Sequence, residues 1–220
     1  MLTFRGVEAK LPTLIYTGAE AEIYIQEWFG EIVIRKQRVP KSYRAPMLDS
    51  NIRHMRTSHE ATMLREVRKL GVAVPTVQHI DQESTSLIMD FINGRTLKEE
   101  LHLISKSERR TRCRALGEIL AAMHLGGVVH GDVTLSNVIS QNGKLFLIDF
   151  GLGNFSKEVE ARGVDLLLLN RSMRSTHYMY HAELFRSFVE GYRHVFGRKS
   201  REVFEKMGEV ERRGRYFERG

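Results

Sequence analysis

The sequence predicts an α+β fold of two lobes, in which a small antiparallel β-sheet lobe with one main helix precedes a mostly helical lobe. Two observations support this division. Short segments with strand-like alternation and tight turns recur within residues 1–93, whereas residues 94–220 carry long segments with a helical spacing of apolar residues. A chain of 220 residues is long enough to give two small lobes an ample core.

The first lobe is expected to begin with three antiparallel strands at residues 14–17, 22–28 and 31–36. The first two strands are joined by a tight turn, which consists of Gly18, Ala19, Glu20 and Ala21. On the third strand, alternation places Lys36 on the same face as the two isoleucines that precede it and Arg35 on the opposite face.

One helix is expected after a basic linker at residues 40–50. It would begin near Asn51 or Thr57 and end before Gly71, with a stripe of apolar residues along one side. Glu60 on this helix has two interpretations. It could close a capping box with Thr57 at the helix start, or it could pair with Lys36.

Two further strands are predicted near residues 77–80 and 86–91, and the lobe boundary is predicted near Gly94. The chain leaving the sheet at Met89, Asp90 and Ile92 would be an extended link between the lobes, with backbone groups free to bind a ligand. The alternative for this segment is a buried strand followed by an ordinary turn.

The second lobe is predicted to contain helices at residues 96–103 and 108–125 and another that begins at Ala161. Asp165 lies in a nearly continuous apolar run, so we expect it to bind backbone amides of the loop at residues 130–137. A last helix is expected up to Val210, followed by a basic tail from about residue 211.

Two motifs in this lobe contain candidate catalytic and metal-binding residues. His130-Gly131-Asp132 is followed five residues later by Asn137, and Asp149-Phe150-Gly151 follows an apolar strand. Phosphoryl transfer from ATP requires a carboxylate to orient the acceptor hydroxyl and oxygen ligands for Mg²⁺. Asp132 suits the first role, and Asn137 and Asp149 suit the second. Each residue alone would be an ordinary turn former or strand cap, but their order and spacing favour catalysis.

The composition indicates the partners and the cellular compartment to expect. A net charge of +7 and a pI near 9.6 favour a polyanionic partner such as nucleic acid, although a basic face can also be simply solvated. The single cysteine, Cys113, cannot form an internal disulfide, which favours a reducing cytoplasm. We expect no membrane span and no signal peptide, because no apolar run is long enough.

The sequence resembles the small atypical kinase subunit of the KEOPS (EKC) complex, the family of p53-related protein kinase, over nearly its whole length. The resemblance rests on several short motifs of this chain: Gly18-Ala19-Glu20-Ala21, Lys36, Pro40-Lys41-Ser42-Tyr43-Arg44, Leu48-Asp49, Arg56-Thr57, Glu60-Ala61, Gly71-Val72, Val74-Pro75, His130-Gly131-Asp132, Thr134, Ser136-Asn137, Asp149-Phe150-Gly151-Leu152, Val164-Asp165-Leu166 and Arg213-Gly214-Arg215.

This resemblance implies a bilobal protein-kinase-like fold without a long activation loop, and Mg-ATP hydrolysis or serine/threonine phosphorylation. It implies that Asp132, Lys36 and Glu60 are catalytic, that Asn137 and Asp149 hold the metal, and that the turn at Gly18 and the segment from Met89 to Ile92 bind ATP. The implied partners are tRNA, bound through the basic surface and tail, and other KEOPS subunits, chiefly the threonylcarbamoyl-transferase subunit.

Two departures from ordinary protein kinases affect the predicted activity. Gly131 and Thr134 stand where such kinases have an arginine and a lysine, so transfer to a protein hydroxyl should be weakened and water is a possible acceptor. Two alternatives remain open, namely a small-molecule phosphotransferase of the aminoglycoside or choline kinase type and a non-catalytic tRNA-binding scaffold.

Overall fold

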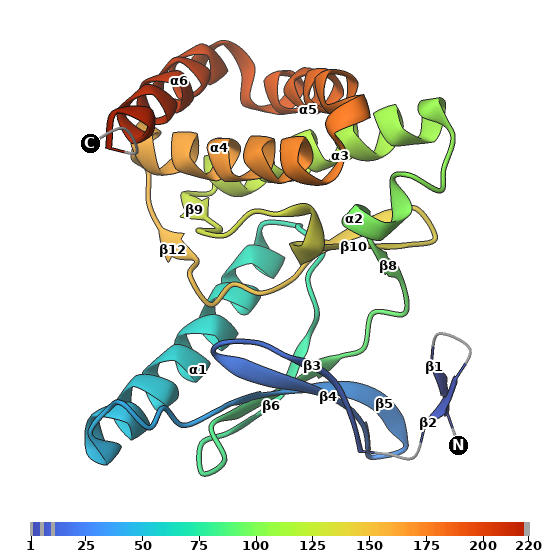
Figure 1. Ribbon diagram of the computed structural model, residues 1–220, viewed down its shortest axis with the longest axis vertical. Helices are drawn as coiled ribbons and strands as arrows, with labels where there is room; N and C mark the ends of the chain where they lie inside the picture. Colours follow the sequence, from blue (N-terminus) through green and yellow to red (C-terminus); the bar gives the residue numbers. More distant parts are fainter. Residues whose placement is uncertain (1, 5–6, 10–11, 218–220) are drawn as a thin grey trace. The chain divides into compact units, whose positions relative to one another are not determined.

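The computed structural model describes residues 2–4, 7–9 and 12–217 and divides them into two compact units (Figure 1). The first unit contains residues 1–65 and 75–92, and the second contains residues 66–74 and 93–220. We predicted a boundary after residue 93, and the two units divide after Ile92. The short segment from 66 to 74 joins the second unit because, for example, the Leu147 amide donates to the Ala73 carbonyl at 3.0 Å.

The first unit is built on a five-stranded antiparallel sheet of order β3-β4-β5-β7-β6. Its strands are β3 (Thr13–Thr17), β4 (Ala21–Trp28), β5 (Glu31–Arg38), β6 (Val77–Asp81) and β7 (Ser86–Asp90). A separate two-stranded ladder precedes it, formed by β1 (Leu2–Phe4) and β2 (Val7–Ala9). The predicted strands are therefore present, and β5 is central, so both of its edges are hydrogen-bonded.

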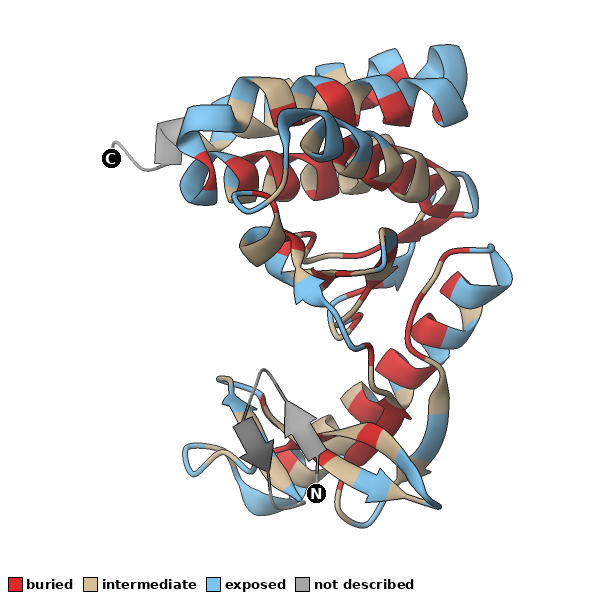
Figure 2. Ribbon diagram, turned by 90° about the vertical axis from the view of Figure 1, so that its right-hand side faces the viewer, coloured by how far each residue is buried: buried red, intermediate tan, exposed pale blue. Residues whose placement is uncertain are grey.

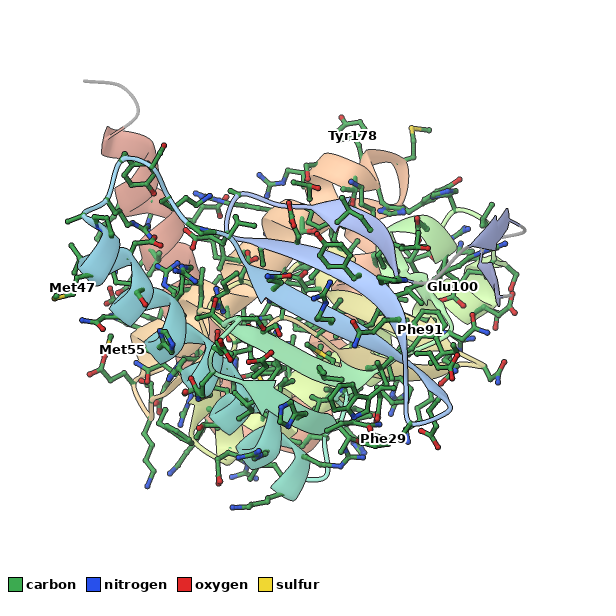
Figure 3. The ribbon with its side chains drawn as sticks, turned by 90° about the horizontal axis from the view of Figure 1, so that it is seen from below. Phe29, Met47, Met55, Phe91, Glu100 and Tyr178 are labelled. Atoms are coloured by element: carbon green, nitrogen blue, oxygen red, sulfur yellow. The ribbon has the colours of Figure 1, made fainter. Side chains whose placement is uncertain are left out.

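Helix α1 (Pro46–Lys69) begins earlier than the sequence predicted. Proline is favoured at the first helical position, where its missing N–H is not needed. The first half of the helix lacks an apolar stripe and exposes Met47 and Met55, by 79% and 68% (Figure 3). A helical spacing of apolar residues is present only in the second half, where Ala61 and Leu64 are buried.

The second unit contains four long helices and several short elements. The long helices are α3 (Lys106–Leu125), α4 (Val159–Thr176), α5 (His181–Phe196) and α6 (Ser200–Phe217). Helix α3 packs along α5 and α4 packs along α6, so that α5 and α6 form a layer over α3 and α4 (Figure 1). Figure 2 shows buried residues gathered along the inner helices, with the exposed residues of the outer pair facing away.

The remaining elements of this unit are short. They are β8 (Arg95–Thr96), α2 (Leu97–Glu100), β9 (Val128–Val129), η1 (Leu135–Asn137), β10 (Val138–Gln141), β11 (Lys144–Leu147), β12 (Asn154–Phe155), η2 (Tyr178–Tyr180) and η3 (Gly197–Lys199). β10 and β11 form a hairpin whose turn residues, Asn142 and Gly143, both have positive φ. β12 pairs with β9, a contact that sequence reasoning missed because each strand has only two residues.

Several predictions about the second unit change. Helix α2 covers only residues 97–100 of the predicted helix at 96–103, and α4 begins at Val159 rather than at Ala161. The capping box of Ser105 and Glu108 starts α3 at Lys106 rather than at residue 108. Helix α6 continues to Phe217, so the basic residues Arg212 and Arg213 lie on a helix and not on an extended tail. Glu218 and Arg219 of the predicted tail lie outside the described residues.

Helix α3 buries one face, and Cys113 lies on it with no exposed surface. Burial raises the pKa of its thiol to about 12, so this cysteine is an inert core residue. Among the residues that the structure describes, no helix is long and apolar enough to cross a membrane.

Candidate active site

In the first unit, one buried carboxylate holds two cations. Lys36 Nζ lies 2.7 Å from Glu60 Oε1, and Arg38 Nη2 lies 2.8 Å from Glu60 Oε2. All three residues are at most 9% exposed. The Glu60 carboxylate therefore fixes the end of the Lys36 side chain through a buried ion pair.

This contact resolves the two interpretations of Glu60. Thr57 lies within α1, where its hydroxyl donates to the Arg53 carbonyl at 2.8 Å, so it does not cap the start of the helix. The capping-box interpretation is therefore wrong, because the helix begins eleven residues before Thr57, at Pro46. Sequence reasoning missed Arg38, although the period of two along β5 places it on the face of Lys36.

Arg35 points to the other face of β5. Its guanidinium carbon lies 4.4 Å from the centre of the Tyr24 ring, which is a cation–π contact. The Arg35 side chain is therefore directed away from Glu60. Tyr24 is the cross-strand neighbour of Arg35 in the ladder with β4. The strand register thus separates the two adjacent basic residues in the way that alternation predicted.

The turn between β3 and β4 is tied to other parts of the first unit. The Gly18 amide donates to the Ala21 carbonyl at 2.9 Å, which closes the turn. Lys41 Nζ donates to the Ala19 carbonyl, and the Arg56 guanidinium pairs with the Glu20 carboxylate. Two basic side chains therefore lie at the turn that we predicted to contact phosphates.

The segment predicted to bind adenine begins as a strand and then becomes irregular. Met89 is buried within β7, and the Asp90 carboxylate accepts the Thr76 amide at 2.9 Å. Asp90 is the last residue of β7, and Ile92 is buried just beyond it. The Asp90 amide also donates to the Thr76 carbonyl at 3.0 Å, so both its side chain and its amide are structural. The irregular backbone that follows β7 is then the part of this segment that could bind a ligand.

In the second unit, the Asp165 carboxylate binds the start of the His130-Gly131-Asp132 motif. Its Oδ2 accepts the His130 amide at 2.6 Å, and its Oδ1 accepts the Gly131 amide at 2.8 Å. Asp165 is only 1% exposed, as expected for a carboxylate that backbone donors satisfy. The prediction that Asp165 binds backbone amides of this loop is confirmed.

The His130 ring fixes the next part of the loop. Its Nε2 donates to the Ile148 carbonyl at 3.1 Å, and its Nδ1 accepts the Asp132 amide at 3.3 Å. Burial lowers the pKa of His130 below its ordinary value, so the ring is neutral and can accept at Nδ1. Its ring centre lies 4.4 Å from that of Phe150, so the two predicted motifs are in direct contact.

Asp132 and Asn137 face each other across the loop. Asn137 Nδ2 donates to the Asp132 carbonyl at 2.9 Å and to its Oδ2 at 3.1 Å. Because the amide nitrogen is used in this way, the amide oxygen of Asn137 is the atom left for a metal. The Asn137 amide thus holds the Asp132 carboxylate through its Oδ2.

Asp149 lies two residues after the end of β11. Its backbone is in the left-handed conformation, with φ +63°, and the residue is exposed. A non-glycine residue in this region is uncommon, and such strain is often retained at functional sites. The next residue, Phe150, is fully buried. The backbone therefore turns the carboxylate outward while the phenyl ring anchors the motif in the core.

Gly131 is required by the backbone at its position. Its φ is +80°, and a Cβ atom there would lie 2.2 Å from the Leu152 carbonyl oxygen. An arginine at this position, which is common in protein kinases, would force the two loops apart. The absence of that arginine is thus coupled to how closely the two motif loops approach each other.

The donor set fits Mg²⁺, which prefers a few hard oxygen ligands and keeps several waters. Asn137 and Asp149 each offer an oxygen from neighbouring segments of the second unit, which the Ile148 amide joins by donating to the Asn137 carbonyl at 3.0 Å. The structure describes no group of three or more His, Cys, Asp and Glu side chains that could form an all-protein metal cage. This donor set therefore suits a metal that also binds a phosphate.

Comparisons with known proteins point in the same direction as this geometry. A family model described as RIO1, RIO domain, matches residues 32–159. The chain is 44% identical over 214 residues to the KEOPS complex subunit Bud32 of Pyrococcus abyssi, which covers 94% of this chain and 97% of that relative.

Two longer relatives share the name probable bifunctional tRNA threonylcarbamoyladenosine biosynthesis protein. The one from Methanothermobacter thermautotrophicus is 37% identical over 211 residues, covering 96% of this chain and 38% of the relative. The one from Methanobrevibacter smithii is 38% identical over 210 residues, covering 94% and 37%. With the match to Bud32 over nearly the full length of both chains, these findings show that the chain belongs to the RIO-domain family and, within it, to the family of the small atypical kinase subunit of KEOPS complexes.

Proposed function

We propose that this chain is the Mg-ATP-dependent kinase or ATPase subunit of a KEOPS complex and that it supports threonylcarbamoyladenosine modification of tRNA. The observation that carries the catalytic part is the loop geometry of the second unit. There, Asp132 and Asn137 are in hydrogen-bond contact, and Asp149 is turned outward by a left-handed backbone. These are the groups that phosphoryl transfer requires.

The groups of the two units have complementary roles in this proposal. Lys36, held by Glu60, contacts the ATP phosphates, the turn at Gly18 covers them, and the backbone from Met89 to Ile92 binds adenine. Asn137 and Asp149 hold Mg²⁺, which would neutralise charge on the phosphates. Asp132 orients the acceptor and accepts its proton.

The choice of acceptor favours water over a protein hydroxyl. Thr134 offers no positive charge to the transferring phosphoryl group, and a charged donor at such a position can change the rate by two to three orders of magnitude, roughly 10²–10³. Gly131 likewise provides no cation to anchor a phosphorylated segment. We therefore propose that ATP hydrolysis is the main reaction and serine/threonine phosphorylation the slower one.

The proposed protein partner is the threonylcarbamoyl-transferase subunit. In the bifunctional relatives, the part similar to this chain is only 38% or 37% of a longer chain, whose name assigns it to tRNA threonylcarbamoyladenosine biosynthesis. Joining two activities in one chain is consistent with two subunits that work in contact. A separate chain similar to Bud32 would then bind that partner non-covalently.

The proposed tRNA contact is the end of α6. Arg212 and Arg213 are exposed there, and Arg213 also pairs with Glu160 at 2.8 Å. A guanidinium can bind two phosphate oxygens at once, so both residues are suited to an RNA backbone. The net charge of +7 would add a general attraction for a polyanion.

The test measures ATP turnover by the wild-type chain in the assembled complex, with and without tRNA, and with a panel of small acceptors. We expect Asp149→Ala to abolish Mg-ATP turnover while the protein keeps its fold, because it removes a metal ligand that is exposed rather than part of the core. Circular dichroism and thermal unfolding check the fold.

The same experiment separates the alternatives. Wild-type turnover by a folded Asp149→Ala protein would overturn the site. Turnover that depends on an aminoglycoside or choline would favour a small-molecule phosphotransferase. Binding of tRNA without any turnover would favour a scaffold subunit.

A further inference from the structure

Two fully buried polar side chains of the second unit have no role in the chemistry proposed above. They are His124 near the end of α3 and Tyr192 on α5. The Tyr192 hydroxyl oxygen lies 2.8 Å from His124 Nδ1, and His124 Nε2 lies 3.2 Å from Asp165 Oδ2. A continuous line of hydrogen bonds therefore runs from α5 through α3 and α4 to the loop that carries Asp132.

The direction of each hydrogen bond follows from the chemistry of its ends. A carboxylate oxygen only accepts, so His124 Nε2 carries a proton and donates to Asp165. With that proton on Nε2, Nδ1 is the ring nitrogen that accepts the proton of the Tyr192 hydroxyl. Burial raises the pKa of Tyr192 above its ordinary value, so this hydroxyl remains protonated and remains a donor.

The last bond in the line reaches the catalytic loop. Asp165 Oδ2, the oxygen that accepts from His124, is also the oxygen that accepts the His130 amide at 2.6 Å. The other oxygen accepts the Gly131 amide. The His124 ring and the two loop amides therefore set the orientation of the carboxylate together. The carboxylate in turn holds the backbone that leads directly to Asp132.

Close packing of α3 against α5 sets the position of Tyr192. A Cβ atom on Gly117 would lie 2.1 Å from the Phe188 carbonyl oxygen, and one on Gly191 would lie 2.0 Å from the Arg114 carbonyl oxygen. The two helices can approach this closely only because each presents a glycine. The same approach brings the Tyr192 hydroxyl within reach of His124.

Aromatic neighbours hold the Tyr192 ring without help from its hydroxyl. Its centre lies 5.1 Å from that of Phe196, 5.5 Å from that of Phe204 and 6.1 Å from that of Phe188. Apolar packing would therefore be served equally by phenylalanine at this position. What the hydroxyl adds is the hydrogen bond to His124.

We infer that Tyr192 and His124 are positioning residues that act through Asp165 on the loop carrying Asp132. The Asp165 carboxylate fixes the tautomer of the His124 ring, and the Tyr192 hydroxyl fixes the orientation of the ring. The ring in turn fixes the Asp165 oxygen that holds the His130 amide. The α3–α5 packing is thereby coupled to the geometry of the loop. The kinetic part of the following test rests on the proposed function, whereas the exchange part does not.

The test uses Tyr192→Phe, which removes one oxygen and keeps the ring. We expect kcat for ATP turnover to fall about five-fold, the effect of one hydrogen bond, while KM for ATP stays unchanged. Phe188→Leu is the matched control, because it perturbs the same aromatic cluster on α5 but breaks no hydrogen bond. It should lower Tm and leave kcat unchanged.

A double-mutant cycle identifies the route of the effect. His124→Gln keeps an N–H donor for Asp165 but loses the ring nitrogen that accepts from Tyr192. Adding Tyr192→Phe to His124→Gln should then change kcat little further, because the shared hydrogen bond is already absent. Independent, additive losses would contradict the route through His124.

Amide hydrogen exchange tests the inference without any measurement of activity. In Tyr192→Phe, the amides of His130 and Gly131 should exchange faster by about ten-fold, with no matching change at Leu116 in the middle of α3. Unchanged exchange at both loop amides in Tyr192→Phe, or an equal change in Phe188→Leu, would overturn the inference. If the wild-type protein turns over no ATP, the exchange result still decides it.

Discussion

The two units use a buried carboxylate in contrasting ways. In the first unit, Glu60 holds two side-chain cations, Lys36 and Arg38, one on each oxygen. In the second, Asp165 holds two backbone amides and the ring of His124. Both carboxylates are at most 2% exposed, and both are fully used as hydrogen-bond acceptors.

The difference lies in what each carboxylate controls. Glu60 places charges at the ends of side chains, which can still reorient toward an anionic ligand. Asp165 determines the path of the backbone, which cannot reorient without breaking the loop. We therefore expect changes at Asp165 to affect folding and activity together, and changes around Glu60 to affect mainly activity.

The largest expected effect is that of Asp165→Ala. This change leaves the His130 and Gly131 amides and the His124 ring without their acceptor in a buried site. The loss in unfolding free energy should be about 4 kcal/mol, measured by urea denaturation, together with loss of ATP turnover. Asp165→Asn, which keeps one carbonyl acceptor, should lose less stability. A fully stable Asp165→Ala protein would contradict the claim that Asp165, unlike Glu60, determines the path of the backbone.

A smaller effect on stability but a large one on activity is expected for Lys36→Ala. Removing the cation proposed to contact the ATP phosphates should lower turnover roughly 100-fold, whereas Arg38 still neutralises Glu60. Arg35→Ala is the matched control, because Arg35 packs on Tyr24 on the opposite face of β5. Steady-state kinetics decide between them. Equal losses of turnover from Lys36→Ala and Arg35→Ala would contradict the assignment of the Lys36 face of β5 to the nucleotide.

The smallest effect, confined to RNA binding, is expected at the end of α6. There the cations are exposed rather than paired with a buried carboxylate. Replacing Arg212 and Arg213 by alanine should weaken tRNA binding by the complex, and the loss should shrink as salt rises, because each phosphate contact releases counterions. Basal ATP turnover should not change.

The control for this prediction replaces Arg198 and Lys199, two exposed basic residues of η3 at the other end of α6. Titration of tRNA at two salt concentrations provides the measurement. Coinciding curves for the α6 variant and the wild-type complex would contradict the proposed tRNA contact. Substitution is preferable to truncation after Glu211, because truncation would remove the last six residues of α6, 212–217.

Much of the fold could be predicted from local patterns. The strands of the first unit, the buried face of α3 and the turn at Asn142-Gly143 follow from alternation, helical spacing and residues that tolerate positive φ. The start of α1 could not be predicted in this way, because its first turns face solvent and have no apolar stripe. The end of α6 was missed for a similar reason, since a charged sequence does not distinguish an exposed helix from a tail.

The sequence by itself determined which groups are available for chemistry, because the type and spacing of Lys36, Asp132, Asn137 and Asp149 are properties of the chain. It also determined that Asp165 needs polar partners, because a carboxylate in an apolar helix cannot be buried alone. Only the tertiary structure decided which partners these are. Arg38 beside Glu60, His124 beside Asp165 and Leu152 against Gly131 are contacts between distant segments. No local pattern specifies such pairs, because they depend on how helices and strands pack.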